Sequence, residues 1–481
     1  MNSLKFPQLA LLTAILATTA CSTTTNTTGT DEGSLVTAEK GVDTVLLSGK
    51  FYTGDGNDSW AEALAIENGE IAYVGSMEGI GVFIGDKTKV IDLKGDMALP
   101  SFVDSHLHPL TNSYAALFQV SLFNLTTTEQ YLNAISEFAK KNIGNEWLVG
   151  AGFESFVFGE AGPRKEVLDS IFPDRAIAIV DRDIHSMLVN SKALEVMGIT
   201  ADTPIEVAGG GQIIKDSNGN PTGLLVDDAA MNLARGFFPL ATKAQYKTSL
   251  LWMQDWLNSE GITTAHDAWV EFDENYYQAF NELAQEGKLT VRYRGSWIVD
   301  PTEDDYIGQI DYGVELSEQF NHPHFQVNSF KFLTDGVLDL GSALVIDESG
   351  EISGPEVWQQ DKMVDAYTYA DKEGFQLHVH AVGDGAMQLT LDALSEVQQQ
   401  NGSRDSRHSL AHVELITPSD IKRMGKLGLS AHITTSSFGS EEGAIEHSAV
   451  TVEVSTEAPL KSLMVADINV ALASDYATSD P

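Results

Sequence analysis

The sequence predicts an α/β protein in which a large (β/α)8 TIM-like barrel follows a small β domain. Two observations lead to this prediction. From Ser101 onward, short apolar strand candidates alternate with helical segments, a pattern typical of a parallel sheet. The preceding residues, 42–100, contain short strand-like runs separated by turns. With 481 residues and 43% hydrophobic content, the chain can form one large barrel with additions and a sizeable core.

The first 21 residues indicate an export signal and not part of the fold. Lys5 precedes an apolar run, Leu9–Ala17, that is too short to span a bilayer, and small residues then lead to Cys21. This segment resembles a bacterial lipoprotein signal, which implies lipidation of Cys21; an ordinary cleaved signal peptide is the alternative. We therefore expect an exported protein in the cell envelope, lipid-anchored and facing the periplasm.

The bulk composition excludes two classes of partner. The chain has 29 basic and 69 acidic residues, a net charge of −40, and such a surface repels nucleic acid and anionic lipid. Contact with the membrane is expected only through the anchor on Cys21. Because Cys21 is the single cysteine, the remaining chain has no internal disulfide and no thiolate nucleophile. Residues 22–41 begin with a run rich in Thr, Ser and Asn, which predicts a flexible tether.

The small β domain, residues 42–100, is predicted from its turns. Two apolar runs, Ala63–Ile66 and Ile71–Val74, flank Asn68–Gly69, and an Asn-Gly pair between apolar runs favours a hairpin. A turn at Gly95 then leads into the first strand of the larger domain, which covers residues 101–481.

Ten strand candidates follow Ser101, two more than a closed barrel needs. The region 110–240 carries two of them, Trp147–Gly150 and Ala176–Val180, together with clusters of turn-forming Gly, Pro and Asn. We interpret this region as an insertion after the first barrel strand. The eight remaining candidates are Phe102–His106, Ile262–His266, Val291–Ile298, Val327–Leu333, Gln376–His380, Ser409–Val413, Leu429–Ile433 and Val470–Ser474.

The first barrel strand ends in two histidines. Side chains two residues apart point to the same face of a strand, so His106 and His108 project together while Leu107 faces the opposite side. Two imidazoles at the carboxyl end of a strand suit a metal ion. A pair of histidines on a solvated strand edge is the alternative.

Further polar residues stand at or near the ends of later strands, where barrel enzymes place their active sites. They are Lys331, His378, His380, His412 and Asp475. Lysine is rarely buried without a partner, so Lys331 is either an edge lysine with its head in solvent or a carboxylated lysine that bridges metals. Asp475 closes an apolar strand and is either a turn residue or a carboxylate beside the metal.

The other histidines carry weaker signals. Pro323 interrupts the strand geometry between His322 and His324, so we expect a loop there. His432 and His447 have no ligand-like context. Three histidines are candidates for contact with substrate or for packing: His185, His266 and His378.

Five barrel strands, 1, 4, 5, 6 and 8, carry in this order the HxH pair, a lysine, a histidine, a second histidine and an aspartate. This order resembles that of the metal-dependent amidohydrolase superfamily. The surrounding phrases are similar to its YtcJ-like branch, which includes N-substituted formamide deformylases. The matching phrases are Pro100–His108, Asp183–Ser186, Asn190–Leu194, Gly261–Thr264, Lys331–Gly336, His380–Asp384 and His408–His412. The resemblance extends over residues 42–476.

This resemblance implies a distorted barrel with a small β-sandwich domain, and hydrolysis of amide-type C–N bonds other than peptide bonds. His106 and His108 are implied to bind one divalent metal, with zinc as the expected ion. Lys331, once carboxylated, is implied to bridge to a second ion held by His380 and His412.

The resemblance also implies that Asp475 touches the first metal and transfers protons. Zinc lowers the pKa of bound water from 15.7 to about 7, so hydroxide is available at neutral pH. The hydroxide is expected to attack a carbonyl polarised by the metal. Asp475 is expected to accept the proton and return it to the leaving nitrogen. The expected substrate is a small-molecule amide.

Proteins of this kind continue well beyond the last-strand aspartate, so we expect a barrel without its last helix and an incomplete small domain.

Alternatives to the hydrolase function stay open at this point. One alternative function is a mononuclear deaminase or an isomerase on the same barrel. Another is a non-catalytic lipoprotein that binds small ligands. Metal stoichiometry and the mass of Lys331 separate the first alternative from the hydrolase, because a mononuclear site needs no bridging carboxylate.

Overall fold

The computed structural model describes residues 41–143, 146–303, 305–338, 340–434 and 459–476. The predicted signal with Cys21, the tether up to residue 40 and His447 lie outside these ranges. The chain divides into two compact units, of which the smaller runs to Val103 and includes Gly261–Thr263. None of the helices in the described ranges combines the length and apolar character that a membrane crossing needs.

The smaller unit contains two sheets. One has the order β5–β4–β1–β6 and the other β3–β2–β7. Their strands are β1 Thr44–Leu47, β2 Lys50–Tyr52, β3 Trp60–Ala61, β4 Ala63–Glu67, β5 Glu70–Gly75, β6 Lys89–Asp92 and β7 Met97–Ala98, with the 3-10 helix η1 at Ile80–Phe83. The predicted hairpin joins β4 to β5 through Asn68 (φ 53°) and Gly69 (φ 80°), both in the left-handed conformation that its tight turn needs.

The larger unit is built on a parallel barrel, as predicted. Its strands follow in the order β8–β16–β17–β19–β22–β23–β24–β25, and the successive pairs from β16 to β25 are parallel. They are β8 Phe102–Leu107, β16 Ile262–Val270, β17 Arg292–Ile298, β19 Phe325–Leu333, β22 Gln376–Ala381, β23 Ser409–His412, β24 Ser430–Thr434 and β25 Asn469–Ala473. Each predicted barrel strand overlaps one of these, so the predicted fold class is confirmed.

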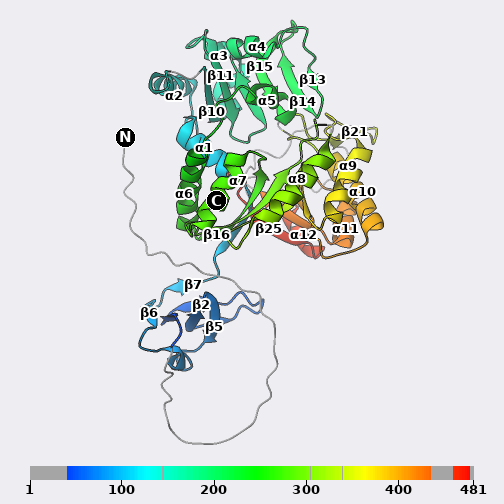
Figure 1. Cartoon of the computed structure of the whole chain (residues 1–481). Coiled ribbons are helices and arrows are strands. Elements are labelled where there is room, and N and C mark those ends of the chain that lie inside the picture. Colours follow the sequence, from blue (N-terminus) through cyan, green and yellow to red (C-terminus); the bar gives the residue numbers. More distant parts are fainter. Residues whose placement is uncertain (1–40, 144–145, 304, 339, 435–458, 477–481) are drawn as a thin grey trace, which may run out of the picture. The chain divides into compact units, whose positions relative to one another are not determined.

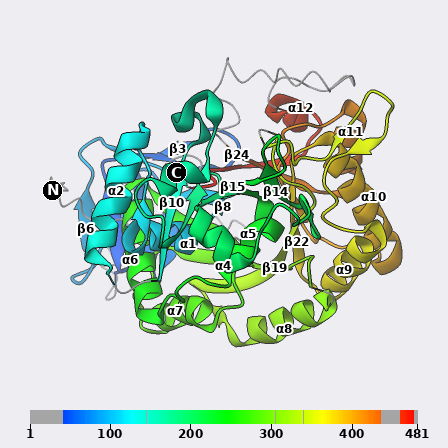
Figure 2. The same ribbon diagram turned by 90° about the horizontal axis from the view of Figure 1, so that it is seen from above.

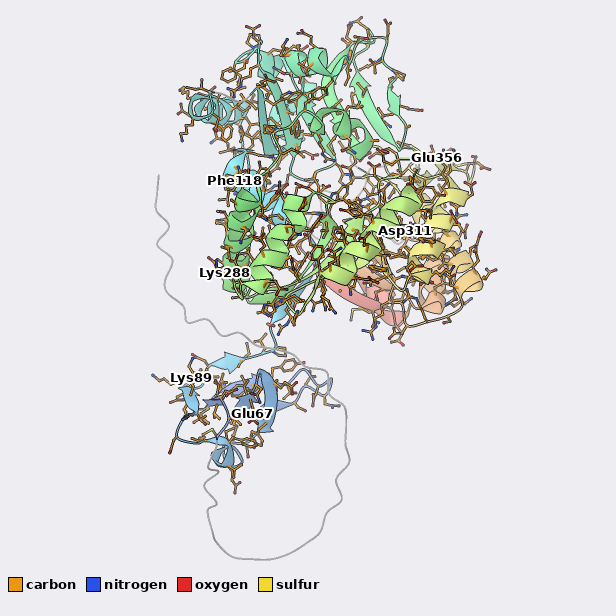
Figure 3. All side chains as sticks on the ribbon, viewed as in Figure 1. Glu67, Lys89, Phe118, Lys288, Asp311 and Glu356 are labelled. Atoms are coloured by element: carbon orange, nitrogen blue, oxygen red, sulfur yellow. The ribbon has the colours of Figure 1, made fainter. Side chains whose placement is uncertain are left out.

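Helices follow one another around the outside of the barrel (Figures 1 and 2). They are α6 Lys243–Ser259, α7 Glu274–Gln285, α8 Tyr306–Gln319, α9 Gln360–Lys372, α10 Asp384–Asn401, α11 Pro418–Leu427 and α12 Leu460–Val465; the short strands β18 Asn321–His322, β20 Val345–Ile346 and β21 Ile352–Ser353 lie between them in sequence. Charged side chains such as Asp311 on α8 and Lys288 after α7 are exposed (Figure 3). For α11, Thr417 caps the first turn and Gly428 (φ 69°) ends the helix.

The segment between the first two barrel strands forms a sheet of its own. It begins with α1 (Pro109–Phe118), and its strand order is β13–β14–β15–β12–β11–β10–β9. Its elements are β9 Val120–Ser121, α2 Thr128–Lys141, β10 Trp147–Phe153, η2 Ser155–Ala161, α3 Lys165–Asp169, β11 Ala176–Asp181, β12 Ser186–Val189, α4 Ser191–Met197, β13 Glu206–Val207, β14 Gly211–Lys215, β15 Pro221–Val226 and α5 Asp227–Arg235. The two strand candidates that we set apart from the barrel are β10 and β11, and they share one apolar core.

Barrel closure joins the first strand to the last. The main-chain nitrogen of Asp475 donates to the carbonyl oxygen of His106 (2.9 Å), and the Ser105 hydroxyl donates to a carbonyl of β25 (2.8 Å). Asp104, which is buried, accepts hydrogen bonds from the Ser474 hydroxyl (2.5 Å) and from the Ser474 main-chain nitrogen (3.2 Å). Asp475 therefore lies beside His106 and His108, although it is far from them in the sequence.

Replacing Ser474 by alanine should destabilise the larger unit, because buried Asp104 loses its hydroxyl donor. The expected loss in the free energy of unfolding is about 1–3 kcal/mol. Urea unfolding followed by circular dichroism measures it. Ser170→Ala, at an exposed serine of the insertion, is the control and should change the free energy by less than about 0.5 kcal/mol. Equal stability of the two variants would contradict the role of Ser474 in closure.

Candidate metal centre

His106 and His108 lie at the carboxyl end of β8, and their rings face a common space. The ring centroids are 5.3 Å apart and the planes are nearly perpendicular. Both rings are buried, with exposed fractions of 1% and 6%, and Leu107 between them is fully buried. β8 ends at Leu107, and His108 occupies the N-cap position of α1, whose first residue is Pro109, without a capping hydrogen bond from its side chain among the described residues. Because proline suits the first helical position, the strand passes directly into a helix beyond the second histidine.

Asp475 stands beside three imidazoles. Its Oδ1 lies 3.3 Å from His108 Nε2 and 3.5 Å from His106 Nε2, and its Oδ2 lies 3.8 Å from His412 Nδ1. Burial raises the pKa of this carboxyl, but the hydrogen bond with His108 and the charge of Lys331 outweigh burial. They hold the pKa of Asp475 well below its usual range. Asp475 is therefore an ionised carboxylate at neutral pH.

His380 and His412 come from the neighbouring strands β22 and β23, and their ring centroids are 4.5 Å apart. His412 Nδ1 lies 3.0 Å from the Thr434 hydroxyl, and His380 Nε2 lies 3.1 Å from the carbonyl oxygen of Gly336. His412 and Asp475 both adopt left-handed backbone conformations, with φ of 74° and 51°. Residues other than glycine are strained in this conformation, and such strain is concentrated at functional sites.

Lys331 lies inside the barrel. It is 2% exposed, and its neighbours on β19, Phe330 and Phe332, are fully buried. The alternative of an edge lysine with its head in solvent is therefore wrong. Burial lowers the pKa of the Lys331 amine to about 8, although Asp475 and Asp228 raise it. More of this amine is unprotonated at neutral pH than in an exposed lysine, as carboxylation requires.

Three imidazoles of the centre, those of His106, His380 and His412, are neutral donors. Burial lowers the pKa of His106 and of His380 well below the ordinary value, and that of His412 to about 3. One ligand atom from each of His106, His412 and Asp475 lies within 4.8 Å of the others, and His108 Nδ1 is buried and has no hydrogen-bond partner among the described residues. Neutral imidazole and ionised carboxylate are the donors that zinc takes. These residues therefore fit a divalent metal between β8, β23 and β25.

The insertion brings His185 to the same space. His185 lies in the loop between β11 and β12, and its ring centroid is 5.2 Å from that of His380. Its Nδ1 lies 3.0 Å from Asp227 Oδ1, and the main-chain nitrogen of Asp227 donates to the His185 carbonyl (2.8 Å). Burial lowers the pKa of His185, but the hydrogen bond and charge of Asp227 outweigh burial and raise the pKa to about 9. A cation therefore borders the centre at neutral pH.

A second layer of histidines lies next to His106, toward the amino ends of the strands. His266, His378 and His432 offer ligand atoms within 4.8 Å of one another. Burial lowers the pKa of His266 to about 3 and that of His432 to about 4. His432, which has no ligand-like context in the sequence, belongs to this group, and its Nδ1 lies 2.9 Å from the carbonyl oxygen of Ser105 inside the barrel. His378 is fully buried, so the structure does not place it on a surface that a substrate reaches.

Sequence reasoning missed several residues that border the centre. The carboxylate of Asp335 accepts hydrogen bonds of 2.9–3.0 Å from three main-chain nitrogens in the loops after β19 and β22. The Trp269 ring centroid lies 6.4 Å from that of His108. Both residues stand at carboxyl ends of barrel strands, and that position is the signal that could have found them. Asp227 has no such signal, because its contact with His185 is formed only when the insertion folds.

The predicted loop at His322–Pro323–His324 is wrong for His322. This residue lies in β18, which pairs antiparallel with β19. Pro323 occupies the turn between the two strands, where it breaks no ladder hydrogen bond. Among the described residues, the groups that could hold a metal include neither His322 nor His324.

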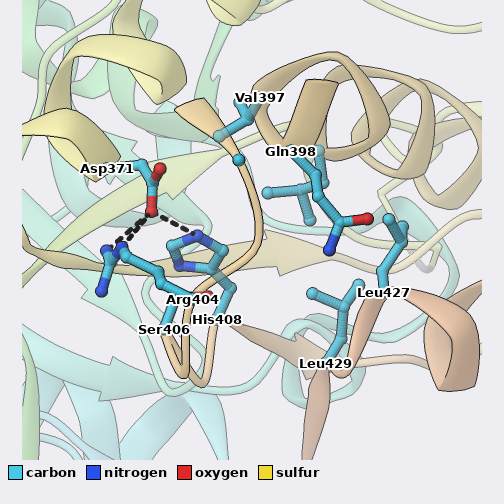
Figure 4. A pocket seen from close by; sticks show the side chains of 10 residues that line it. Asp371, Val397, Gln398, Arg404, Ser406, His408, Leu427 and Leu429 are labelled. Carbon is cyan, nitrogen blue, oxygen red and sulfur yellow. Dashed lines mark hydrogen bonds and ion pairs between the residues drawn. The ribbon is translucent and has the colours of Figure 1, made fainter. Parts of the chain in front are cut away.

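A pocket elsewhere in the molecule lies at the amino end of β23 (Figure 4). His408 immediately precedes this strand, whose opposite end carries His412. Asp371 lies 3.1 Å from His408 Nε2 and accepts hydrogen bonds from Arg404 (2.7 Å) and Asn401 (2.8 Å). The charged groups of this pocket are therefore satisfied by one another. Because barrel enzymes work at the carboxyl ends of their strands, we assign the pocket a structural role.

Comparisons with known proteins agree with this arrangement. Residues 89–481 match the sequence model of the amidohydrolase family. YtcJ of Bacillus subtilis (strain 168) is 29% identical over 407 residues, which cover 81% of this chain and 73% of that protein. The N-substituted formamide deformylase of Arthrobacter pascens is 23% identical over 445 residues, 90% of this chain and 80% of that protein. The crystal structure of an uncharacterized metal-dependent hydrolase from Pyrococcus furiosus has the same fold, with a TM-score of 0.66, 23% identity and coverage of 91% and 86%.

Replacing His412 by alanine should remove the ion that His412 helps to hold, because it deletes one of three converging ligand atoms. Zinc at about a hundredfold excess over its Kd should stabilise the original chain by about 2.7 kcal/mol, and His412→Ala far less. Metal analysis after chelation and reloading, together with thermal unfolding, measures both effects. His322→Ala, at a histidine away from the centre, is the control. Equal metal content in the original chain and His412→Ala would contradict the site.

Proposed function

The chain belongs to the amidohydrolase family, and we propose that it is a metal-dependent hydrolase of carbon–nitrogen bonds in small-molecule amides. Its membership in the family makes it a hydrolase; the amide substrate and the roles of individual residues are our proposals. The N-substituted formamide deformylase among its relatives favours N-formyl and N-acyl amines as the substrate class. We propose zinc as the metal.

One observation carries this proposal. His106, His412 and Asp475 come from the first, sixth and last strands of the barrel, and their ligand atoms lie within 4.8 Å of one another. The imidazoles are neutral and the carboxylate is ionised, so the set is ready to bind a cation without first losing protons. A buried cluster of this composition at the carboxyl end of a barrel supports metal-assisted hydrolysis better than it supports packing.

We assign the proposed ligands to two positions. His106 and His108 hold the first ion together with Asp475. Lys331, His380 and His412 hold a second ion if the Lys331 amine is carboxylated. A divalent metal held there supplies a Lewis acid for the substrate carbonyl and a water that ionises near neutral pH.

Two side chains of the chain itself handle charge and protons in this proposal. Asp475 is ionised and adjacent to the imidazoles, so it can accept a proton and later donate it to the leaving nitrogen. His185, held as a cation by Asp227, borders His380 and is suited to contact a developing carboxylate. Trp269 offers an apolar wall beside His108.

The full-length chain should release a free amine and a carboxylic acid from N-formyl or N-acyl amines. Asp475→Asn should lower kcat by about 10²–10⁴-fold, because the variant has no carboxylate to carry the proton. A screen of such amides, with the amine and the acid quantified, measures this. Asp467→Asn is the matched control, since Asp467 is an exposed aspartate close to the same strand.

The products separate this function from its alternatives. A deaminase releases ammonia, an isomerase gives a product of unchanged mass, and a ligand-binding protein gives no product. Either of the first two results, or binding without turnover by the metal-loaded chain, would contradict the proposed amide hydrolysis.

Lys331 should carry one carbon dioxide in the metal-loaded protein. The neutral amine adds to carbon dioxide, forms an N–C bond and releases one proton, which gives a carbamate. Mass spectrometry of the chain kept at neutral pH should show this gain, and acid should remove it. Lys288, which is exposed, should remain unmodified and is the internal control. A single ion per chain with unmodified Lys331 would favour the mononuclear alternative over the binuclear site.

A further inference from the structure

A hydrogen-bonded chain runs from the metal centre into the barrel interior. His106 Nδ1 lies 2.7 Å from His378 Nε2, and His378 Nδ1 lies 2.7 Å from the Ser409 hydroxyl. All three residues are buried, with exposed fractions of 1% for His106 and 0% for His378 and Ser409. Because none of these groups reaches bulk solvent, each depends on the partner that the protein supplies.

The direction of this chain follows from the chemistry of imidazole. Two neutral imidazoles share a hydrogen bond only when one nitrogen carries a proton and the other a lone pair. His106 Nε2 faces Asp475 (3.5 Å), on the side of the proposed ligands, so it must be unprotonated to bind a cation. The proton of His106 then lies on Nδ1, which donates to His378 Nε2. His378 keeps its own proton on Nδ1 and donates it to Ser409.

The two other histidines of this layer have different partners. The Nδ1 atoms of His266 and His432 lie 3.1 Å and 2.9 Å from the carbonyl oxygen of Ser105, and a carbonyl only accepts. His266 Nε2 lies 2.8 Å from the Ser296 hydroxyl. Most ring nitrogens of this layer are thus already used in hydrogen bonds, which argues against a second metal site there. The same bonds hold the peptide that precedes His106, so the layer forms a support for this ligand.

We propose that His378 is a positioning residue for the metal centre: it accepts the Nδ1 proton of His106 and so keeps the Nε2 lone pair of His106 directed at the metal. This inference rests on the proposed function, because it requires a metal on His106. Ligand histidines depend on such a partner for their tautomer and orientation, and loss of the partner costs about 10–100-fold in metal affinity.

Two substitutions of His378 in the full-length chain separate this role from packing. His378→Phe fills the space without offering an acceptor, whereas His378→Gln offers an oxygen to His106 and an amide donor to Ser409. We expect zinc affinity to fall about 10–100-fold in His378→Phe and to recover in His378→Gln. His322→Gln, at a histidine that pairs with β19 away from the centre, is the control and should bind zinc like the original chain. Competition with a chromogenic chelator measures Kd, and urea unfolding verifies that each variant is folded.

Nitrogen-15 NMR of the histidines in the metal-free protein reads the tautomer directly. His106 should be protonated at Nδ1 in the original chain and should lose this preference in His378→Phe. The proposal is overturned by equal zinc affinity in the original chain and His378→Phe, by no recovery in His378→Gln, or by a His106 proton on Nε2 in the original chain. An original chain that binds no zinc yet holds the Nδ1 tautomer would contradict the proposed function while supporting the contact between His378 and His106.

Discussion

The contact between the first and last barrel strands is the constraint on which the proposed site depends. His106 and His108 stand at the end of β8, and their carboxylate partner, Asp475, follows the last barrel strand, β25. The hydrogen bond from the Asp475 main-chain nitrogen to the His106 carbonyl holds Asp475 next to His106. A second hydrogen bond between the same strands joins the buried side chains of Asp104 and Ser474. Without this closure, Asp475 would not lie beside His106 and His108, and the proposed site would lack its carboxylate ligand.

Burying many ionisable groups at one end of a barrel costs free energy, unless some of the groups are neutral and each charged group has a partner of opposite charge. The imidazoles near the barrel axis are neutral, as the lowered pKa of His412 and of His266 shows. His185 has the opposite state, because Asp227 raises its pKa to about 9. Environments that push pKa values apart in this way assign donors and acceptors within one site. The insertion thus contributes the positively charged imidazole of His185, and the barrel contributes the neutral imidazoles.

Local patterns predicted the barrel and the strand-end residues because both have short-range signals. The period of two placed His106 and His108 on one face, and Gly/Pro/Asn clusters marked the region that forms a separate sheet. The role of His432 could not be predicted, because a single histidine within a strand looks the same whether it packs or contacts other strands. The contact of His185 with Asp227 and that of His378 with His106 join residues 42 and 272 positions apart. The first pair forms only when the insertion folds, and the second only when the barrel closes.

Anomalous X-ray diffraction at the zinc edge, from crystals of the zinc-loaded chain, is the most direct test of a metal centre between the first and last strands. We expect the strongest peak within about 2.0–2.2 Å of His106 Nε2 and of an Asp475 carboxylate oxygen, which are zinc bonding distances. A peak enclosed by His266, His378 and His432 instead, or no peak inside the barrel, would contradict this centre.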